Sequence, residues 1–190
     1  MTTINIMTPL TRPINIDRMY SSMWHLWPDF HLRWIVVADD DKDPDVESRL
    51  AVTNPLIEIV AGHHKQPSTG HAQRNYALDH LTIPGYVYWL DDDNVIHPLF
   101  FGKLRRFERQ GWKGMLFGQH RAKDGYVSPD LRHIDTGQIV VHTSLIGDTR
   151  WGLYYTADGD FIREVYAKDP DAFIFVDEVA TYHNRLRRGD

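Results

Sequence analysis

The first 110 residues of the chain alternate between short apolar runs and longer segments whose apolar residues recur at helical spacing. The apolar runs, rich in β-branched and aromatic residues, are 4–8, 32–38, 55–60 and 86–90. The segments with helical spacing are 14–26, 45–51, 70–82 and 97–110. Strands that alternate with helices indicate β/α units around a mostly parallel sheet. We therefore predict an α/β fold whose mostly parallel central sheet is flanked by helices.

Beyond residue 112 the chain carries more Gly and Pro punctuation, then an amphipathic stretch at 160–168 and a strand-like run at 172–185. Two of the predicted helices have an apolar stripe at helical spacing that should face the core. The stripes are Phe100, Leu104 and Phe107 in the helix at 97–110, and Phe161, Ile162, Val165 and Tyr166 in the later one. The sequence has no internal repeat, low-complexity tract or linker, so we predict a single domain over 1–190.

Composition narrows the possible function classes. The chain is 42% hydrophobic and 25% charged, as in ordinary soluble domains, and no apolar run approaches the roughly 18 residues that span a bilayer. Its N-terminus lacks the pattern of a signal peptide, so we expect a cytoplasmic or otherwise soluble protein with no transmembrane segment. The absence of cysteine excludes disulfides, thiolate zinc sites and cysteine nucleophiles. A net charge of −5 argues against a nucleic-acid partner.

Groups that can serve a polar ligand follow each predicted strand. The first strand ends at Thr8 and Pro9, the second at Asp39, the third at 62–64 and the fourth at 91–93. In open α/β sheets, ligands bind outside the carboxyl ends of the strands. We therefore predict that these four strand ends meet at one crevice.

Three consecutive aspartates, Asp91, Asp92 and Asp93, follow the apolar run at 86–90. Carboxylates packed together repel one another unless a positive group lies between them. Oxygen ligands in a partly open site suit Mg²⁺ or Mn²⁺, which commonly take their remaining ligands from water and substrate phosphates. The alternative is that the aspartates form a turn and cap the helix that begins near Pro98.

Two other metal sites are disfavoured. The acidic run at 39–45 does not match a calcium loop, because its sixth position is Pro44 and its twelfth is Leu50, where glycine and glutamate are needed. A histidine site at 63–64 and His71 is disfavoured because adjacent loop histidines usually face different ways and no His-x-x-x-His helix pair accompanies them.

Several stretches together resemble the GT-A fold glycosyltransferases that use nucleotide sugars, most closely the β-1,3-glucuronyltransferases of glycosyltransferase family 43. "TPLTRP" at 8–13 is similar to the family's Thr-Pro-Thr-Tyr-x-Arg-Pro, and "LRWIVVAD" at 32–39 to its Leu-His-Trp-Ile-Val-Val-Glu-Asp. "QRNYALDHL" at 73–81 is similar to Gln-Arg-Asn-x-Ala-Leu-x-Trp-Leu, and "VYWLDDDN" at 87–94 to Val-Tyr-Phe-Ala-Asp-Asp-Asp-Asn. The resemblance implies a GT-A (Rossmann-like nucleotide-sugar-binding) fold.

The second half resembles the family in three shorter patches. "IDTGQIVV" at 134–141 is similar to Ile-Asp-Met-Ala-Gly-Phe-Ala-Val, "ADGDFIREV" at 157–165 to Gln-Glu-Ser-x-Leu-Leu-Arg-Glu-Leu, and "TYHNRL" at 181–186 to Val-Trp-His-Thr-Arg-Thr. The chain is shorter than that family's catalytic domain at 41–69 and 111–133, and its small size is like that of family 2. The resemblance implies a nucleotide-binding half, 1–96, and an acceptor and catalytic half, 97–190.

The resemblance also implies roles for individual residues. The donor-binding residues would be Thr8, Pro9, Arg12, Asp39, Arg74, Asp91, Asp92, His183 and Arg185. Among these, Asp39 would accept a hydrogen bond from a uracil-like base, Arg74 would pair with phosphate or the next carboxylate, and His183 would grip the diphosphate. Asp93, with Asp91, would hold the metal. The alternatives are a capped loop at Asp39, a surface salt bridge at Arg74 and an exposed, idle His183.

An inverting transfer needs a base for the acceptor hydroxyl. The resemblance puts that base at Asp158, where the family has the longer glutamate, and Asp160 is the reserve candidate. Either aspartate could instead be the N-cap of the helix that follows.

These features together predict a metal-dependent inverting glycosyltransferase that uses a nucleotide sugar, most simply a UDP-sugar, and a glycan or other hydroxyl acceptor. Three alternatives stay open: a sugar nucleotidyltransferase, an aspartate-based metal phosphohydrolase, and a non-catalytic module that binds nucleotide sugars or glycans. "MTPLTRP" lacks the glycine-rich loop with which nucleotidyltransferases usually open, and a phosphohydrolase needs no nucleoside site at Thr8 and Asp39.

Overall fold

The first half of the chain builds the parallel part of the sheet. The computed structural model describes residues 1–23, 30–38, 58–63, 70–121 and 123–186. Within these ranges the four strands lie side by side and parallel, in the order β3 (Glu58–His63), β2 (His31–Ala38), β1 (Thr3–Leu10) and β4 (Tyr86–Trp89). This arrangement confirms the predicted α/β fold and its parallel strands. The helix expected at 45–51 lies outside the described residues.

The second half extends this sheet with strands of mixed direction. β8 (Ile139–His142) runs antiparallel to β4, and β6 (Gly114–Arg121) runs antiparallel to β8. β9 (Phe173–His183) lies parallel to β6, with a register shift around Phe117 and Gly118, and pairs with the short β5 (Val95–Ile96) at the edge. A further short strand, β7 (Gly125–Val127), pairs with β6. The nine strands within the described ranges form one sheet.

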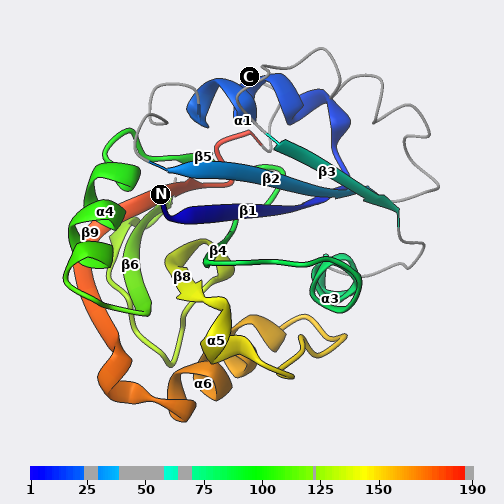
Figure 1. Ribbon diagram of the computed structural model, residues 1–190. Helices are drawn as coiled ribbons and strands as arrows, with labels where there is room; N and C mark the ends of the chain where they lie inside the picture. The colour runs from blue at the N-terminus through cyan, green and yellow to red at the C-terminus, as the bar shows by residue number, and fades with distance from the viewer. Residues whose placement is uncertain (24–29, 39–57, 64–69, 122, 187–190) are drawn as a thin grey trace.

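Helices cover both faces of this sheet (Figure 1). The 3₁₀ turn η1 (Pro13–Asn15), α1 (Ile16–Met23) and α4 (Phe100–Arg109) lie on one face, and α3 (His71–His80), α5 (Thr143–Ile146) and α6 (Ala157–Lys168) on the other. Successive strand residues alternate between the two cores: Trp34 packs with the first set, and Ile35 with the second. The short turns η3 (Thr136–Gln138) and η4 (Pro170–Ala172) complete the described elements.

Both predicted apolar stripes are confirmed. Phe100, Leu104 and Phe107 are buried along α4, and Phe161 and Val165 are buried along α6. Burying a side chain of this size stabilises the fold by roughly 1.5–3 kcal/mol. The α6 stripe therefore anchors the helix that carries Asp158 and Asp160 against the sheet.

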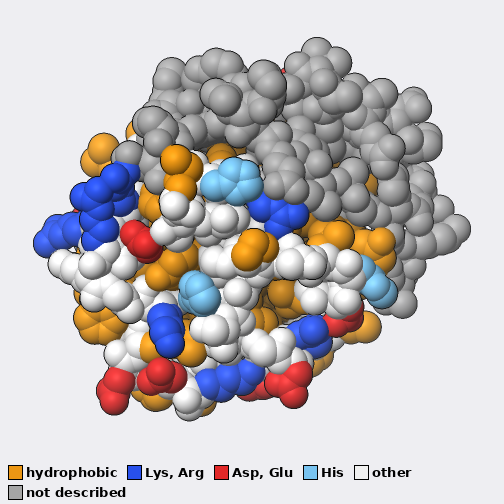
Figure 2. Space-filling view, viewed as in Figure 1, with side chains coloured by type: hydrophobic (Ala, Val, Ile, Leu, Met, Phe, Trp, Pro, Cys, Tyr) orange, Lys and Arg blue, Asp and Glu red, His pale blue; other side chains and the backbone are white. Residues whose placement is uncertain are grey.

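Charged side chains of both signs lie along the lower edge of the molecule, near α5 and α6 (Figure 2). Ion pairs contribute to this mixture, including Arg150 with Asp79 at 2.7 Å and Lys168 with Asp148 at 3.8 Å. This edge is therefore neither a purely positive nor a purely negative surface. No helix within the described ranges combines the length and the apolar character needed to cross a membrane.

Candidate active site

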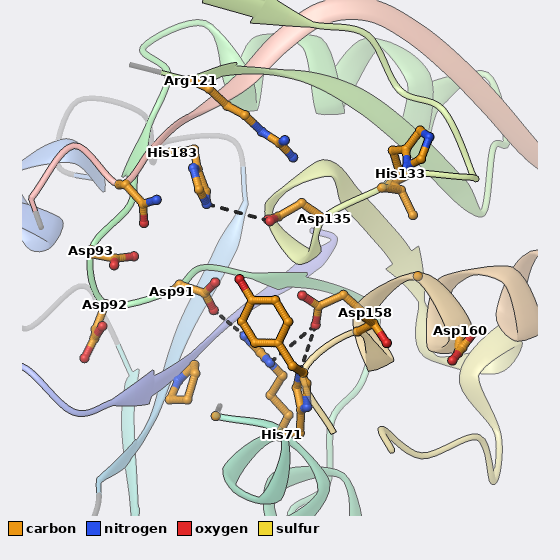
Figure 3. A pocket seen from close by; sticks show the side chains of 18 of the residues that line it. His71, Asp91, Asp92, Asp93, Arg121, His133, Asp135, Asp158, Asp160 and His183 are labelled. Carbon is orange, nitrogen blue, oxygen red and sulfur yellow. Dashed lines mark hydrogen bonds and ion pairs between the residues drawn. The ribbon is translucent and has the colours of Figure 1, made fainter. Parts of the chain in front are cut away.

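A pocket of about 720 Å³ opens where β1 and β4 end, between the start of α3, the start of α6 and the end of β9. Its walls carry Asp91, Asp93, Asp135 and Asp158 together with arginine and histidine side chains. Figure 3 shows Asp91, Asp135 and Asp158 pointing toward one another across this space. Segments that are far apart in the sequence thus bring several carboxylates to one cavity.

Asp91 faces the pocket with its charge partly compensated. Its Oδ1 accepts a hydrogen bond from Nη2 of Arg74, and its Oδ2 lies 3.3 Å from the hydroxyl of Thr136. Burial raises the pKa of Asp91 to about 6; the Arg74 guanidinium opposes this increase, while Asp135, Asp158 and Asp93 add to it. A positive ligand in the pocket would therefore stabilise the ionised form of Asp91.

Asp92 has a different environment, although it is the next residue. Its Oδ2 accepts hydrogen bonds from the backbone N–H of Thr11 at 2.6 Å, the hydroxyl of Thr11 at 2.8 Å and the backbone N–H of Arg12 at 2.6 Å. Its Oδ1 accepts from the Arg12 guanidinium. Figure 3 shows Asp92 pointing away from the carboxylates of Asp91 and Asp158. Both oxygens thus fasten the segment that follows β1.

Asp93 is buried at the pocket wall, with its Oδ2 3.3 Å from Nη1 of Arg12. Its backbone carbonyl accepts a hydrogen bond from Leu186 N at 2.9 Å, which ties the triplet to the segment after β9. The aspartates do form a turn, in which Asn94 N donates to the Asp91 carbonyl at 3.0 Å, but they do not cap the next helix, because α4 begins after Leu99 and has no side-chain cap.

A divalent cation fits the chemistry of this wall. No group of three histidine or acidic side chains within the described residues is placed to hold a metal ion by itself. Asp93 and Asp91 supply hard oxygen ligands, which suit Mg²⁺ or Mn²⁺ when phosphate and water complete the coordination.

Arg74 lies on α3 and is only 2% exposed, so the alternative of a surface salt bridge is wrong. Besides its bond to Asp91, its Nη1 is 3.8 Å from Oδ1 of Asp158, and its guanidinium carbon is 5.1 Å from the centre of the Trp151 ring. Nη1 and Nε have no hydrogen-bond partner within the described part of the chain. Arg74 therefore links the two carboxylates and keeps donor capacity in reserve.

Asp158 lies in the first turn of α6, where the N-cap is Thr156, so the N-cap alternative is wrong for both Asp158 and Asp160. Oδ1 of Asp158 is 2.9 Å from Nε2 of His71. Asp160 lies at the rim and is bound by the Tyr154 hydroxyl and the guanidinium of Arg163. These hydrogen bonds hold the pKa of Asp160 below its usual value. Asp158 is the aspartate turned toward Asp91 (Figure 3).

The other predicted donor-binding residues take several positions. Pro9, Arg12 and His183 line the pocket, with Nε2 of His183 3.7 Å from Oδ2 of Asp135. Thr8 is buried, and its hydroxyl accepts a hydrogen bond from Trp34 Nε1 at 3.0 Å. Arg185 is exposed and lines a smaller neighbouring cavity beside Tyr182. Asp39 lies outside the described residues.

Asp135 is a pocket residue with no predicted role, although it lies within the motif at 134–141. The Asp135 carboxylate accepts the backbone N–H of Gly137 at 3.0 Å, while Gln138 Oε1 accepts the backbone N–H of Asp135 at 3.1 Å. This capping box starts η3 and turns Asp135 toward His183. An acidic residue followed three positions later by glutamine was the available signal.

Comparison with known proteins places this fold in a class. Two solved structures share the fold over nearly the whole chain: TarS from S. aureus, with a TM-score of 0.75, covers 96% of this chain and 36% of its own at 15% identity. The mannosyltransferase PcManGT from Pyrobaculum calidifontis, solved with GDP-Man and Mn²⁺, has a TM-score of 0.69 and covers 98% of this chain and 58% of its own at 13% identity. The fold is therefore that of the GT-A glycosyltransferases, as predicted.

A sequence relative agrees with this class. The chain is 30% identical over 132 residues to galactosylgalactosylxylosylprotein 3-beta-glucuronosyltransferase 1 of Rattus norvegicus, and the match covers 56% of this chain. The chain spans 39% of that relative's length. A shorter TarS structure, residues 1–349 in complex with UDP-GlcNAc, also matches, with a TM-score of 0.68 at 14% identity over 96% of this chain and 58% of its own. No family model matches the chain. The predicted resemblance to the glucuronyltransferases is confirmed at this level of similarity.

Proposed function

We propose that this chain is a metal-dependent, inverting glycosyltransferase that moves a sugar from a nucleotide sugar, a UDP-sugar, to a hydroxyl group of a glycan or other acceptor. The observation that carries the proposal is that Asp91, Asp93 and Asp158 line one pocket in a GT-A fold. The similarity to a glucuronosyltransferase and to structures with bound UDP-GlcNAc and GDP-Man supports the reaction class. We assign most of the donor site to residues 1–96, with His183 as a donor contact from the second half, and the acceptor and catalysis to 97–190.

Asp93, with help from Asp91, would hold Mn²⁺ or Mg²⁺. The Mn²⁺ in the mannosyltransferase neighbour supports this assignment. Because no group of three acidic or histidine side chains among the described residues is placed to hold a metal, diphosphate oxygens and water would supply the remaining ligands. When bound, the cation supplies Lewis-acid stabilisation of the diphosphate leaving group. Without that positive charge the ionised form of Asp91 is disfavoured: burial raises its pKa, and the nearby carboxylates of Asp135, Asp158 and Asp93 raise it further.

Direct contact with the donor is supported by position for five pocket residues: Pro9, Arg12, Arg74, Asp91 and His183. Arg74 is the most specific of them, because buried N–H groups of a guanidinium bind phosphate or hydroxyl oxygens strongly. Asp39 stays in the proposal as the residue that reads the base.

Three predicted donor residues have positions that favour other roles. The Asp92 carboxylate accepts its hydrogen bonds from the segment after β1, and the Thr8 hydroxyl accepts one from Trp34. Arg185 faces a neighbouring cavity. We propose that Asp92 and Thr8 shape the donor site from behind and that Arg185 contacts the donor less directly than His183 does.

Asp158 would act as the base. The acceptor hydroxyl gives its proton to the Asp158 carboxylate while its oxygen bonds to the anomeric carbon, and the bond from that carbon to the diphosphate oxygen breaks with its electron pair leaving on the nucleotide. Asp158 is favoured over Asp160 because its carboxylate faces Asp91 across the pocket, whereas Asp160 is bound to Tyr154 and Arg163.

The test is nucleotide release from a panel of UDP- and GDP-sugars, measured with Mn²⁺ or Mg²⁺ and simple sugar acceptors. We expect one UDP-sugar to be consumed, and Asp158→Asn to lose release while Asp160→Asn on the same helix keeps it. Release by Asp158→Asn and loss in Asp160→Asn would move the base to Asp160. Binding of nucleotide without release from any donor would support the non-catalytic module instead.

A further inference from the structure

His71 is a buried histidine for which neither the metal-site prediction nor the proposed donor contacts provide a role. It is the first residue of α3 and is 1% exposed. Gly70 before it has a φ of 88°, and an added Cβ there would lie 2.8 Å from Cγ of Pro9. The glycine thus lets α3 begin directly against the end of β1, which puts the His71 ring in the pocket wall beneath Asp158 (Figure 3).

The orientation of the His71 ring is fixed by its packing on Trp151. The two rings stack with centroids 5.7 Å apart and an interplanar angle of 10°, and Trp151 in turn stacks on Phe161 of α6 at 3.8 Å. Asn75, one helical turn after His71, donates to the Trp151 carbonyl at 2.9 Å and accepts from the Trp151 N–H at 2.8 Å. α3 therefore holds Trp151 at two points, and Trp151 connects His71 to the helix that carries Asp158.

The contact between His71 and Asp158 uses one carboxylate oxygen. Nε2 of His71 lies 2.9 Å from Oδ1, and Nη1 of Arg74 is 3.8 Å from the same atom. Both of these contacts from the described residues fall on Oδ1, and the Asp158 side chain is 26% exposed. A carboxylate fastened through one oxygen presents the other in a fixed direction.

We propose that His71 is a positioning residue for the base. His71 donates its Nε2 hydrogen to Oδ1 of Asp158, which leaves Oδ2 to take the proton of the acceptor hydroxyl. The expected effect of His71 on kcat rests on the proposed function, whereas the contact between His71 and Asp158 does not. The proton moves from the acceptor oxygen to Oδ2 and later to water, and His71 keeps its own proton throughout. An aspartate is shorter than the glutamate of the family that the chain resembles, so a second group that fixes its rotamer has a clear use.

Two substitutions separate this role from simple packing. His71→Phe keeps a ring to stack on Trp151 but removes the donor, and His71→Gln keeps an N–H donor but removes the ring. We expect His71→Phe to lower kcat between about 10- and 100-fold with the donor KM within about twofold of wild type, as for a misplaced catalytic group. His71→Gln should recover most of that loss. His80→Phe, at an exposed position on the same helix, is the matched control and should be neutral.

A spectroscopic measurement tests the pair independently of turnover. In ¹⁵N-histidine-labelled protein, His71, assigned by its absence in His71→Phe, should carry its proton on Nε2, and that resonance should change in Asp158→Ala but not in Asp160→Ala. An unprotonated Nε2, or a resonance that ignores Asp158→Ala, overturns the contact even if no donor is consumed. If the spectrum is as expected but kcat is unchanged in His71→Phe, the positioning role is overturned. If the spectrum is as expected but the protein consumes no donor, the result counts against the proposed function alone and the contact is established.

Discussion

Replacing Asp92 by asparagine should destabilise the protein, although the residue lies in the centre of a carboxylate triplet at the pocket. The Asp92 carboxylate is 3% exposed and accepts four hydrogen bonds, three on Oδ2 and one from the Arg12 guanidinium on Oδ1. Asparagine can offer its single oxygen to the three donors of the 11–12 segment, but its amide then turns a donor toward Arg12.

The magnitude follows from the change in these bonds. Hydrogen bonds to a charged group contribute about 1.5–3 kcal/mol and neutral ones about 1, so three bonds that lose their charge assistance weaken by at least about 1.5 kcal/mol together. The Arg12 side chain is 38% exposed and can be hydrated, so the lost pair adds only about 1 kcal/mol at most. We therefore expect Asp92→Asn to lower the free energy of unfolding by about 3 kcal/mol.

Urea unfolding followed by tryptophan fluorescence measures this change, with an m value equal to that of wild type as the check on two-state behaviour. Asp148→Asn is the control, since Asp148 is fully exposed and surface changes rarely exceed about 0.5 kcal/mol. A free energy of unfolding for Asp92→Asn within about 0.5 kcal/mol of wild type would refute the reasoning that Asp92 serves the fold.

Three further predictions address the pocket. Burial raises the pKa of Asp91 from 3.8 to about 6, so ionisation of Asp91 lowers the stability of the folded state, and this loss grows as the pH rises from about 4 to 6. Asp91→Asn, which cannot ionise, should be up to about 3 kcal/mol more stable than wild type at pH 7.5 and equal to it at about pH 3. Urea titrations at both pH values measure this, and an identical difference at the two would contradict it. Gly70→Ala should lower stability by about 1–3 kcal/mol, because it places a Cβ against Pro9 at a positive φ; Gly111→Ala, also at positive φ but in open space, separates the clash from the backbone strain. Asp158→Asn should bind UDP with Mn²⁺ as tightly as wild type while losing transfer, and tenfold weaker UDP binding would show that Asp158 belongs to the donor site instead.

The parallel half of the fold could be predicted because its signal is local. Each of the four apolar runs overlaps a strand, although residues 55–57 of the third run lie outside the described ranges and β3 extends to His63. The stripe of Phe100, Leu104 and Phe107 is the buried face of α4. The order of the remaining strands could not be predicted in the same way. β8 enters between β4 and β6 through pairings that only the folded chain brings together, so no spacing in the sequence encodes them.

For the candidate site, the sequence indicated which residues meet but not how each is used. Asp91 and Asp92 are neighbours with the same chemistry, yet the turn after β4 directs one into the pocket and the other toward Thr11 and Arg12. The sequence indicates His71 only as a candidate metal ligand. Its partner depends on the stack with Trp151, a residue 80 positions away that no motif connects to it.

Calorimetric titration of UDP, with and without Mn²⁺, tests the central claim most directly. Wild type should bind UDP with Mn²⁺ and far more weakly without it, Asp93→Ala should lose the effect of Mn²⁺, and Asp148→Ala at an exposed position should behave as wild type. A loss of at least about 1.4 kcal/mol of binding free energy, equivalent to tenfold in affinity, is expected for Asp93→Ala. Absence of binding heat with Mn²⁺ present, or equal binding after Asp93→Ala, would contradict a metal-dependent nucleotide-sugar site at this pocket.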